Sequence, residues 1–376
     1  MEPMADASSV ERVLLNQARA KNIPMNGSIE LLPLCNLNCK MCYVRLSREE
    51  MEAQGRIREV SEWLDIARQM KDNGVLFLLL TGGEPLMYPG FKELFVALKK
   101  MGMILTINTN GTLLDEEWAQ FFAENKPRRI NITVYGSNEE TYRELCRAPK
   151  GFEQATNAIR LLKEKGVDVK VAGSATRANA AEIEDIIKLA HEMNVPAVID
   201  TYMMPAVRER SLPYDHQARL DPLEAARVRV RSLELEMTKE TFKQYRQMMI
   251  DQVDNFVPGE EKEEGIGCMA GNCSFSVNWQ GNLQPCVILS HINANVFEVG
   301  FKNAWNYVLE GAKELKTSSK CSVCSLRPLC RTCVAAGITE EGEANLVPHY
   351  MCEYAKETLR LLREWKEEPE GENVNE

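Results

Sequence analysis

The cysteines are the residues in this 376-residue chain whose type and spacing most directly indicate chemistry. Three of them lie in one short stretch, Cys35-Asn-Leu-Asn-Cys39-Lys-Met-Cys42, directly after a predicted strand. Three thiolates on one loop can hold three irons of a [4Fe–4S] cluster, which leaves the fourth iron without a protein ligand. An open position on a metal is typical of a catalytic site. The alternatives are a zinc site that lacks one ligand and three incidental cysteines.

Eight of the other nine cysteines form a second group in the last third of the chain. The members of this group are Cys268, Cys273, Cys286, Cys321, Cys324, Cys330, Cys333 and Cys352. The run from Cys321 to Cys333 alone fits a zinc ribbon or knuckle, but eight thiolates also saturate two four-iron clusters. Cys146 stands alone, and we interpret it either as a small buried hydrophobe or as a thiol near a cofactor.

The composition restricts the class of protein. Lys and Arg number 45 against 55 Asp and Glu, and the resulting net charge of −10 argues against a nucleic-acid partner. The longest wholly apolar run, 75–80, is far shorter than the roughly 20 residues of a membrane span. The first ten residues are polar and acidic, unlike a secretory signal. We therefore expect a cytoplasmic protein without membrane contact, in which thiols serve as metal ligands or redox groups.

Short apolar runs alternate with amphipathic stretches between residues 28 and 205, and this alternation predicts an α/β domain. The predicted strands are Ser28–Pro33, Val75–Leu80, Ile104–Thr109, Arg129–Val134, Asp168–Ala175 and Ala197–Met203. Their branched, apolar character fits buried parallel strands, and stretches such as 61–70 and 181–190 fit helices laid on a sheet. In such a domain functional residues gather where strands end.

The rest of the chain is expected to form smaller units around this core. The predicted parts are an N-terminal extension (1–27), a helical bridge (206–265), a cysteine-rich domain (266–355) and a C-terminal helix with a charged tail (356–376). The bridge contains one long charged helical pattern over 223–249. The cysteine-rich part contains a predicted hairpin over 279–285 with its turn at 280–282.

A second motif, Thr81-Gly82-Gly83-Glu84-Pro85, ends the second predicted strand. Two glycines let the backbone approach a ligand and offer it their N–H and C=O groups, and Glu84 could accept from an ammonium group. A tight strand-to-helix turn is the alternative interpretation of this motif alone. Together with the C-x3-C-x2-C loop after the first strand, however, Gly-Gly-Glu-Pro resembles the radical S-adenosylmethionine (radical SAM) superfamily over residues 28–205.

The resemblance implies a partial (β/α)6 barrel, S-adenosylmethionine as cofactor and a [4Fe–4S] cluster held by Cys35, Cys39 and Cys42. In that family the amino and carboxylate groups of S-adenosylmethionine chelate the open iron. One electron from the cluster cleaves the cofactor to methionine and a 5′-deoxyadenosyl radical, which abstracts a hydrogen atom from the substrate. An electron donor such as flavodoxin or ferredoxin is implied as a partner.

The resemblance also implies which residues contact the cofactor. These are Tyr43, Gly82, Gly83, Glu84, Asn108, Asn110, Thr133 and Arg147. The two asparagines lie in a segment that resembles the family's ribose contact, Thr133 stands where a Ser is common, and Arg147 matches an Arg that pairs with the methionine carboxylate. Met41 replaces an aromatic residue of the family pattern, and Tyr135 stands where an Asp is frequent. Neither departure removes a metal ligand.

The late cysteines resemble the SPASM extension that follows the barrel in part of this superfamily, over about residues 265–355. By that pattern the first auxiliary [4Fe–4S] cluster would be held by Cys268, Cys273, Cys286 and Cys333, and the second by Cys321, Cys324, Cys330 and Cys352. The resemblance thus implies three clusters, of which the two auxiliary ones serve electron transfer or structure. Two residues separate Cys330 from Cys333 here, whereas three are usual in that pattern.

SPASM enzymes often modify peptides, so we expect an enzyme that forms a radical on a peptide or protein side chain. A thioether or carbon–carbon crosslink in a ribosomal peptide is the favoured product. The alternatives are formylglycine formation of the sulfatase-maturase kind, radical oxidation of a small molecule and, from another class, a non-catalytic zinc or iron–sulfur binding module. Because only 34 residues precede Cys35, leader recognition is expected to need a separate protein or direct contact with the barrel and bridge.

One residue after the third auxiliary cysteine bears on the choice between these reactions. Sulfatase maturases resemble this chain but place an Asp there, where a carboxylate can act as general base. Here Val287 follows Cys286 and cannot accept a proton. We therefore expect a reaction other than formylglycine formation, with Asp200 and Tyr202 as the groups that could replace the missing base.

Overall fold

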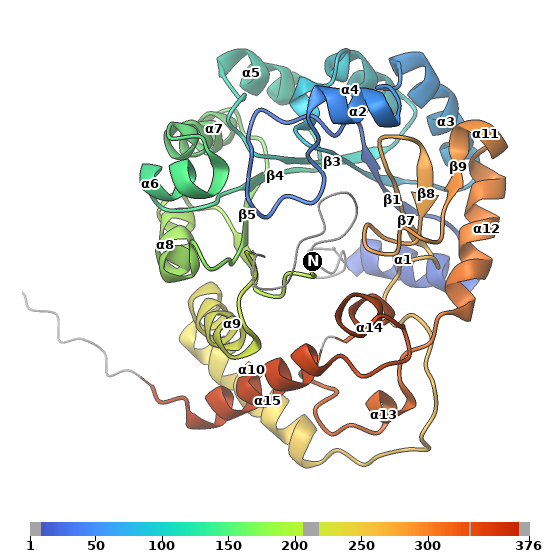
Figure 1. The fold of residues 1–376 in the computed structure, drawn as a ribbon. Coiled ribbons are helices and arrows are strands. Elements are labelled where there is room, and N and C mark those ends of the chain that lie inside the picture. Colours follow the sequence, from blue (N-terminus) through green and yellow to red (C-terminus); the bar gives the residue numbers. More distant parts are fainter. Residues whose placement is uncertain (1–8, 206–217, 331, 368–376) are drawn as a thin grey trace, which may run out of the picture.

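One sheet of nine strands forms the frame of the molecule, described here from a computed structural model that covers residues 9–205, 218–330 and 332–367. The strand order across the sheet is β6-β5-β4-β3-β2-β1-β7-β8-β9. The strands are β1 (Asn26–Glu30), β2 (Phe77–Thr81), β3 (Ile104–Thr109), β4 (Arg129–Thr133), β5 (Val169–Ser174), β6 (Ala197–Asp200), β7 (Ser274–Val277), β8 (Asn282–Gln284) and β9 (Ala294–Asn295). Figure 1 shows the sheet curved into an arc with helices around it.

The first six strands are parallel, and each pairs with its neighbour in the chain. The longer helices between them lie on the outer side of the arc (Figure 1). The connecting elements are α2 (Arg48–Gln54), α3 (Val60–Asp72), η1 (Pro85–Met87), α4 (Phe91–Lys100), α5 (Glu116–Glu124), α6 (Glu139–Thr141), η2 (Tyr142–Cys146), α7 (Gly151–Glu164), η3 (Ala180–Glu182) and α8 (Ile183–Glu192). The predicted α/β fold is confirmed, although the sixth strand ends at Asp200 rather than at Met203.

Alternation along the central strands separates the two faces of the sheet. Ile107 on β3 and Ile132 on β4 are fully buried in the main hydrophobic core. Their chain neighbours Asn108 and Asn131 project to the other face, where Asn131 Nδ2 donates to Asn108 Oδ1 at 2.7 Å. The outer face is therefore the apolar one, and polar groups are concentrated on the inner face.

The sheet continues into the cysteine-rich part of the chain, because β7 pairs with β1 in parallel. β7 and β8 then form an antiparallel hairpin. A hairpin is present as predicted, but its turn spans 278–281, where the N–H of Gly281 donates to the carbonyl of Asn278 at 2.9 Å. The elements that follow are α11 (Val296–Val299), α12 (Phe301–Glu314), α13 (Ser319–Ser322), α14 (Val334–Glu341) and α15 (His349–Glu364).

The predicted helical stretch 223–249 is divided into two helices, α9 (Pro222–Glu236) and α10 (Lys239–Asp254). The break occurs because Thr238 caps α10, with its hydroxyl accepting from the N–H of Thr241 at 3.2 Å. The start of the predicted bridge, 206–217, lies outside the described residues.

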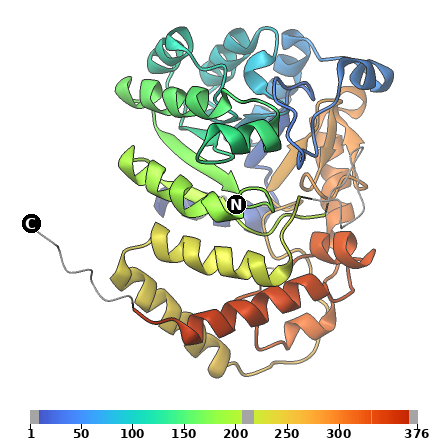
Figure 2. The same cartoon turned by 60° about the vertical axis from the view of Figure 1, so that its left-hand side comes forward.

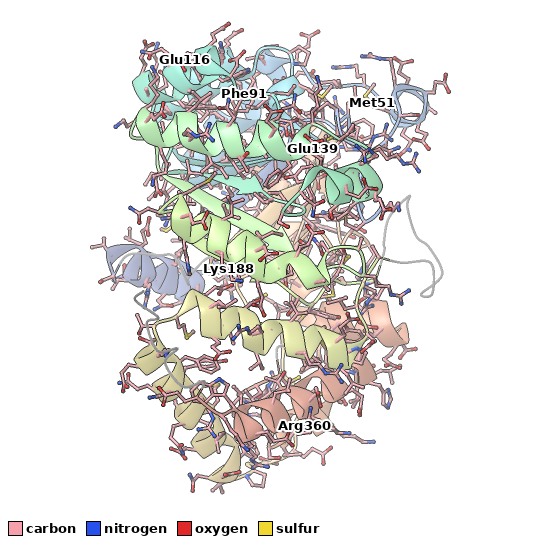
Figure 3. All side chains as sticks on the ribbon, turned by 90° about the vertical axis from the view of Figure 1, so that its left-hand side faces the viewer. Met51, Phe91, Glu116, Glu139, Lys188 and Arg360 are labelled. Atoms are coloured by element: carbon pink, nitrogen blue, oxygen red, sulfur yellow. The ribbon has the colours of Figure 1, made fainter. Side chains whose placement is uncertain are left out.

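Helix α9 lies between α8 and α15, as Figure 2 shows. In the side-chain view of Figure 3, α8 carries the labelled Lys188 and α15 the labelled Arg360. An ion pair between Arg231 and Glu184 at 2.8 Å joins α9 to α8. Helices α9, α10 and α15 share a small core of their own, formed by Val230, Leu233, Phe242, Val253, Leu329, Leu359 and Leu362.

The two ends of the described chain are helical. Helix α1 (Ser9–Lys21) precedes β1, and α15 begins at His349, so that Cys352 lies in its first turn. The end of the predicted charged tail, 368–376, lies outside the described residues. Within the ranges that the structure describes, no helix is both long and apolar enough to cross a membrane.

The joint between β1 and β7 generates the first testable prediction. A Cβ on Gly27 would lie 2.3 Å from the ring of Phe275, which is buried and packs against Phe301 at 5.1 Å. Because that ring has no room to move, Gly27→Ala should lower the free energy of unfolding by about 1–3 kcal/mol, as measured by urea unfolding. Gly259→Ala is the control, since a Cβ there meets nothing within 4 Å. Equal midpoints for both variants would contradict the close packing at this joint.

Candidate functional site

The three early cysteines lie on one loop that follows the carboxyl end of β1. Cys39 is buried, and Cys35 and Cys42 are half-buried. Backbone N–H groups of the same loop donate to two of the sulfurs, from Leu37 to Cys35 Sγ at 3.4 Å and from Arg45 to Cys42 Sγ at 3.3 Å. Hydrogen bonds of this kind stabilise negative charge on sulfur, which is the state that binds iron.

The turn after β2 holds the start of this loop. The N–H groups of Gly83 and Glu84 donate to the carbonyls of Leu32 at 2.8 Å and Leu34 at 2.9 Å. A Cβ on Gly82 would lie 2.5 Å from the carbonyl oxygen of Leu32, and one on Gly83 would lie 2.2 Å from that of Leu34. The two glycines are thus needed for the approach of the chain's own cysteine loop. The N–H of Gly83, expected to face a ligand, is engaged in this contact instead.

Glu84 ties the ends of β2 and β3 together. Its fully buried carboxylate accepts from Leu86 N at 3.1 Å, Thr109 Oγ1 at 2.8 Å and Asn110 N at 2.9 Å. Burial raises the pKa of Glu84 to about 7, although the three donors act in the opposite direction. Glu84, expected to accept from an ammonium group, therefore already has three protein donors, and a nearby cation would further favour its charged form.

Asn110 contacts the first cysteine of the loop, Cys35. Its side-chain amide donates to Cys35 Sγ at 3.6 Å and to Asn36 Oδ1 at 3.0 Å, and its own oxygen accepts from Thr112 Oγ1 at 2.7 Å. Asn36 in turn donates to Thr112 Oγ1 at 2.7 Å. Asn110 is predicted from the sequence as a cofactor contact, whereas Asn36 and Thr112 are not. The only signals in the sequence are that Asn36 directly follows Cys35 and that Thr112 lies two positions after Asn110.

The other predicted cofactor contacts are spread over neighbouring elements. Thr133 is the last residue of β4 and is half-buried, while Asn108 on β3 is bonded to Asn131. Tyr43 follows the cysteine loop and is 36% exposed. Arg147 is exposed and takes the left-handed conformation (φ 57°) directly after the π-helical turn η2. Their contact with a cofactor stays a prediction.

Four late cysteines form a first group around the β7–β8 hairpin. Cys273 directly precedes β7, Cys286 follows β8 and Cys333 directly precedes α14. Burial is the main effect that raises the pKa of Cys273 and Cys286 to about 11. Cys268 acts electrostatically on all three, and Cys333 acts on Cys286. These four thiols therefore lie near enough to one another to interact electrostatically.

The other four late cysteines form a second group beside α15. A cavity at this place is lined by Cys321, Cys324, Cys330 and Cys352, together with Leu326 and Met351 among others. Cys352 and Cys321 act electrostatically on Cys330, and Cys324 acts on Cys352. The two groups are the same two sets that the SPASM resemblance implies. Their role as cluster ligands stays a prediction.

The donor chemistry of the thiol groups suits iron–sulfur clusters, as it also suits zinc. Zinc draws four donors to about 2.3 Å from one point, whereas each thiolate of a four-iron cluster binds a different iron. Among the residues that the structure describes, no three His, Cys, Asp or Glu side chains converge on one ion position. Burial also raises the pKa of Cys35 to about 12, so binding of a metal to this thiol would be coupled to loss of its proton.

Tyr202 does not fit the role of a replacement base. Its hydroxyl donates to Glu340 Oε1 at 2.9 Å, and burial together with that carboxylate raises the pKa of Tyr202 well above its ordinary value. Glu340 also pairs with the fully buried Arg219 at 2.7 Å, and the Arg219 guanidinium stacks on Tyr350 at 4.1 Å. Tyr202 is thus held as a proton donor, which leaves the exposed Asp200 as the remaining candidate.

Comparison with known proteins places this site in a family. Residues 29–190, which include the three-cysteine loop and the Gly-Gly-Glu turn, match the model of the Radical SAM superfamily. These residues form a Radical SAM domain. The cysteine-rich part that follows is consistent with the SPASM type that the sequence predicts.

Several relatives match this chain over most of its length. An AdoMet-dependent heme synthase of Methanosarcina barkeri is 25% identical over 86% of this chain and 94% of its own length. The subtilosin biosynthesis protein AlbA of Bacillus subtilis is 26% identical over 84% of this chain and 68% of its own. The structure of Streptococcus suis SuiB bound to its precursor peptide SuiA is similar in fold, with a TM-score of 0.66, 18% identity and coverage of 91% and 80% of the two chains.

Burial of Glu84 gives the second testable prediction. In the folded protein burial raises the pKa of Glu84 to about 7, whereas the unfolded chain loses this proton near the ordinary carboxyl value of 4.5. The free energy of unfolding should therefore fall as pH rises through this window, by up to about 3 kcal/mol. Urea unfolding at pH 5, 6, 7 and 8 without S-adenosylmethionine measures the effect. Glu84→Gln should lack this contribution, and identical pH profiles for both proteins would contradict it.

Proposed function

We propose that the chain uses S-adenosylmethionine and a [4Fe–4S] cluster on Cys35, Cys39 and Cys42 to form a radical on a peptide side chain. The observation that carries this proposal is the three-thiol loop at the carboxyl end of β1, within the residues that match the family model. When bound, the cluster and its cofactor supply the 5′-deoxyadenosyl radical. The open iron is expected because this loop offers three thiols for four irons.

The protein's own residues position this chemistry. Gly82 and Gly83 let the loop start lie against the turn after β2, and Asn110 holds Cys35 from behind. Glu84 fixes the turn to the end of β3. We propose that the cofactor site is completed by four further residues on or after neighbouring elements. These are Tyr43, Asn108, Thr133 and Arg147.

The late cysteines would hold two auxiliary clusters in a domain that we place at residues 266–355, after the core at 28–205 and the bridge. The first set is Cys268, Cys273, Cys286 and Cys333, and the second is Cys321, Cys324, Cys330 and Cys352. Mutual electrostatic effects within each set support this division. Forming a crosslink removes one hydrogen atom to deoxyadenosine and then a further proton and electron. The auxiliary clusters would accept that electron, and a flavodoxin or ferredoxin would reduce the first cluster.

A ribosomal peptide is the substrate class that we favour, with a thioether or carbon–carbon crosslink as the product. AlbA and the sporulation killing factor maturation protein SkfB, both of Bacillus subtilis, are relatives named for peptide products. SuiB, which is similar in fold, is bound to a precursor peptide. A separate leader-recognition protein would serve as a partner.

Radical oxidation of a porphyrin-like small molecule is the second candidate. Relatives named AdoMet-dependent heme synthase and Fe-coproporphyrin III synthase match 86% and 79% of this chain. Formylglycine formation is less well supported, because Val287 replaces the expected Asp and Tyr202 is committed to Glu340.

Removal of one early cysteine should separate the catalytic cluster from the late ones. Anaerobically reconstituted wild-type protein should hold about twelve irons, and Cys35→Ala should keep about eight of them. The variant should form no deoxyadenosine from S-adenosylmethionine, measured by liquid chromatography. Cys324→Ala is the matched control, since it should lose iron from the second auxiliary set and still cleave the cofactor. Deoxyadenosine formation by Cys35→Ala would contradict the assignment.

The substrate class is tested by offering three substrates under reducing, anaerobic conditions. They are a short peptide encoded beside the gene, Fe-coproporphyrin III and a sulfatase-motif peptide with Cys or Ser. We expect the encoded peptide to lose two hydrogens per crosslink, as measured by mass spectrometry. The amount of crosslink should match the amount of deoxyadenosine formed. Coupled conversion of the porphyrin would favour the second candidate, and coupled formylglycine would overturn the exclusion drawn from Val287.

A further inference from the structure

Cys146 belongs to neither late group, and it lies beside the central cysteine of the early loop. The N–H of Asn38 donates to the carbonyl of Cys146 at 3.1 Å, and the N–H of Lys40 donates to the carbonyl of Leu145 at 2.9 Å. These two backbone bonds flank Cys39 on both sides. They fix Cys39 and Cys146 next to each other although the two residues are far apart in sequence.

The thiols of these two residues are in contact. The Cys146 side chain is hydrogen-bonded to that of Cys39, and Cys35 and Cys42 also lie near enough to act on Cys146 electrostatically. Cys146 is fully buried, with 0% of its surface exposed. Solvent therefore does not compete for this thiol, and a bond from it to sulfur is worth more than in water.

The backbone around Cys146 takes two uncommon conformations. Tyr142–Cys146 forms a π-helical turn, a conformation that is rare and is frequent at functional sites. Arg147, which follows, takes a left-handed conformation (φ 57°) that costs a non-glycine residue about 1–3 kcal/mol. The turn is held by Tyr142, which is fully buried and whose hydroxyl accepts from the N–H of Tyr135 at 3.3 Å. This geometry presents the carbonyl and the thiol of Cys146 to the same loop.

We propose that Cys146 is a positioning residue for the catalytic cluster, whose thiol donates a hydrogen bond to the sulfur of Cys39 and thereby raises the reduction potential of that cluster. This inference rests on the proposed ligand role of Cys39. A donor to a ligand sulfur stabilises the more negative, reduced state of a cluster. Removing the donor therefore makes the cluster harder to reduce, without removing any of its ligands.

The test is an anaerobic redox titration of full-length, reconstituted protein, followed by electron paramagnetic resonance. The catalytic cluster is distinguished from the auxiliary ones as the signal that changes on addition of S-adenosylmethionine. In Cys146→Ala we expect a more negative reduction potential for the cluster that gives this signal. At a fixed applied potential, the ratio of reduced to oxidised cluster should fall about two- to fivefold, because one modest hydrogen bond is lost. Cys146→Ser, which keeps a donor, should stay close to the wild type.

Leu145→Val is the packing control, because Leu145 is equally buried and offers no side-chain donor. It should lower the melting temperature and leave the potential unchanged. Equal potentials in the wild type and Cys146→Ala would overturn the inference, as would an equal shift in Cys146→Ala and Cys146→Ser. A wild-type protein without any signal that responds to S-adenosylmethionine would instead overturn the proposed function itself.

Discussion

The close approach of two backbone segments at the carboxyl ends of β1 and β2 is the constraint on which the site depends. Three hydrogen bonds extend the strand pairing beyond the strands, from Leu31 to Thr81, from Gly83 to Leu32 and from Glu84 to Leu34. They form only because two successive residues of the turn lack a Cβ. The pairing therefore continues up to the residue before the first cysteine, so the rigid sheet sets the position of the loop.

Burial then gives the site its electrostatic character. It raises the pKa of Glu84 to about 7 and that of Cys35 to about 12, so both groups tend to be neutral when no cation is present. A metal cluster reverses this preference, because it binds the thiolate and releases the proton. An ammonium group near Glu84 would act in the same direction. Binding of positive charge at this site is thus linked to deprotonation of the protein.

Local patterns sufficed to predict the six parallel strands and the place of the cysteine loop, since alternation and spacing are encoded within each segment. The misses depend on contacts between distant segments. The β1–β7 pairing joins Ser28 to Ser276, which are 248 residues apart. The contact of Cys146 with Cys39 arises from a π-helical turn, and its sequence gives no clear sign of that shape. The break before Thr238 could have been found, because Thr followed by Lys and Glu is a plausible helix start.

Polar side chains join the cysteine-rich part to the end of β6, in addition to the backbone pairing of β7 with β1. The Arg219–Glu340 ion pair is buried, and Glu340 also accepts from Tyr202 just after β6. Glu340 lies on α14, which starts directly after Cys333. A buried ion pair contributes little net stability, but it is costly to break and so can fix one arrangement. Cys333 also lies near enough to act electrostatically on Tyr202, so this ion pair lies between the end of the sixth strand and one of the late cysteines. The early loop is thus placed by strand pairing, and the cysteine-rich part by the pairing of β7 with β1 together with this ion pair.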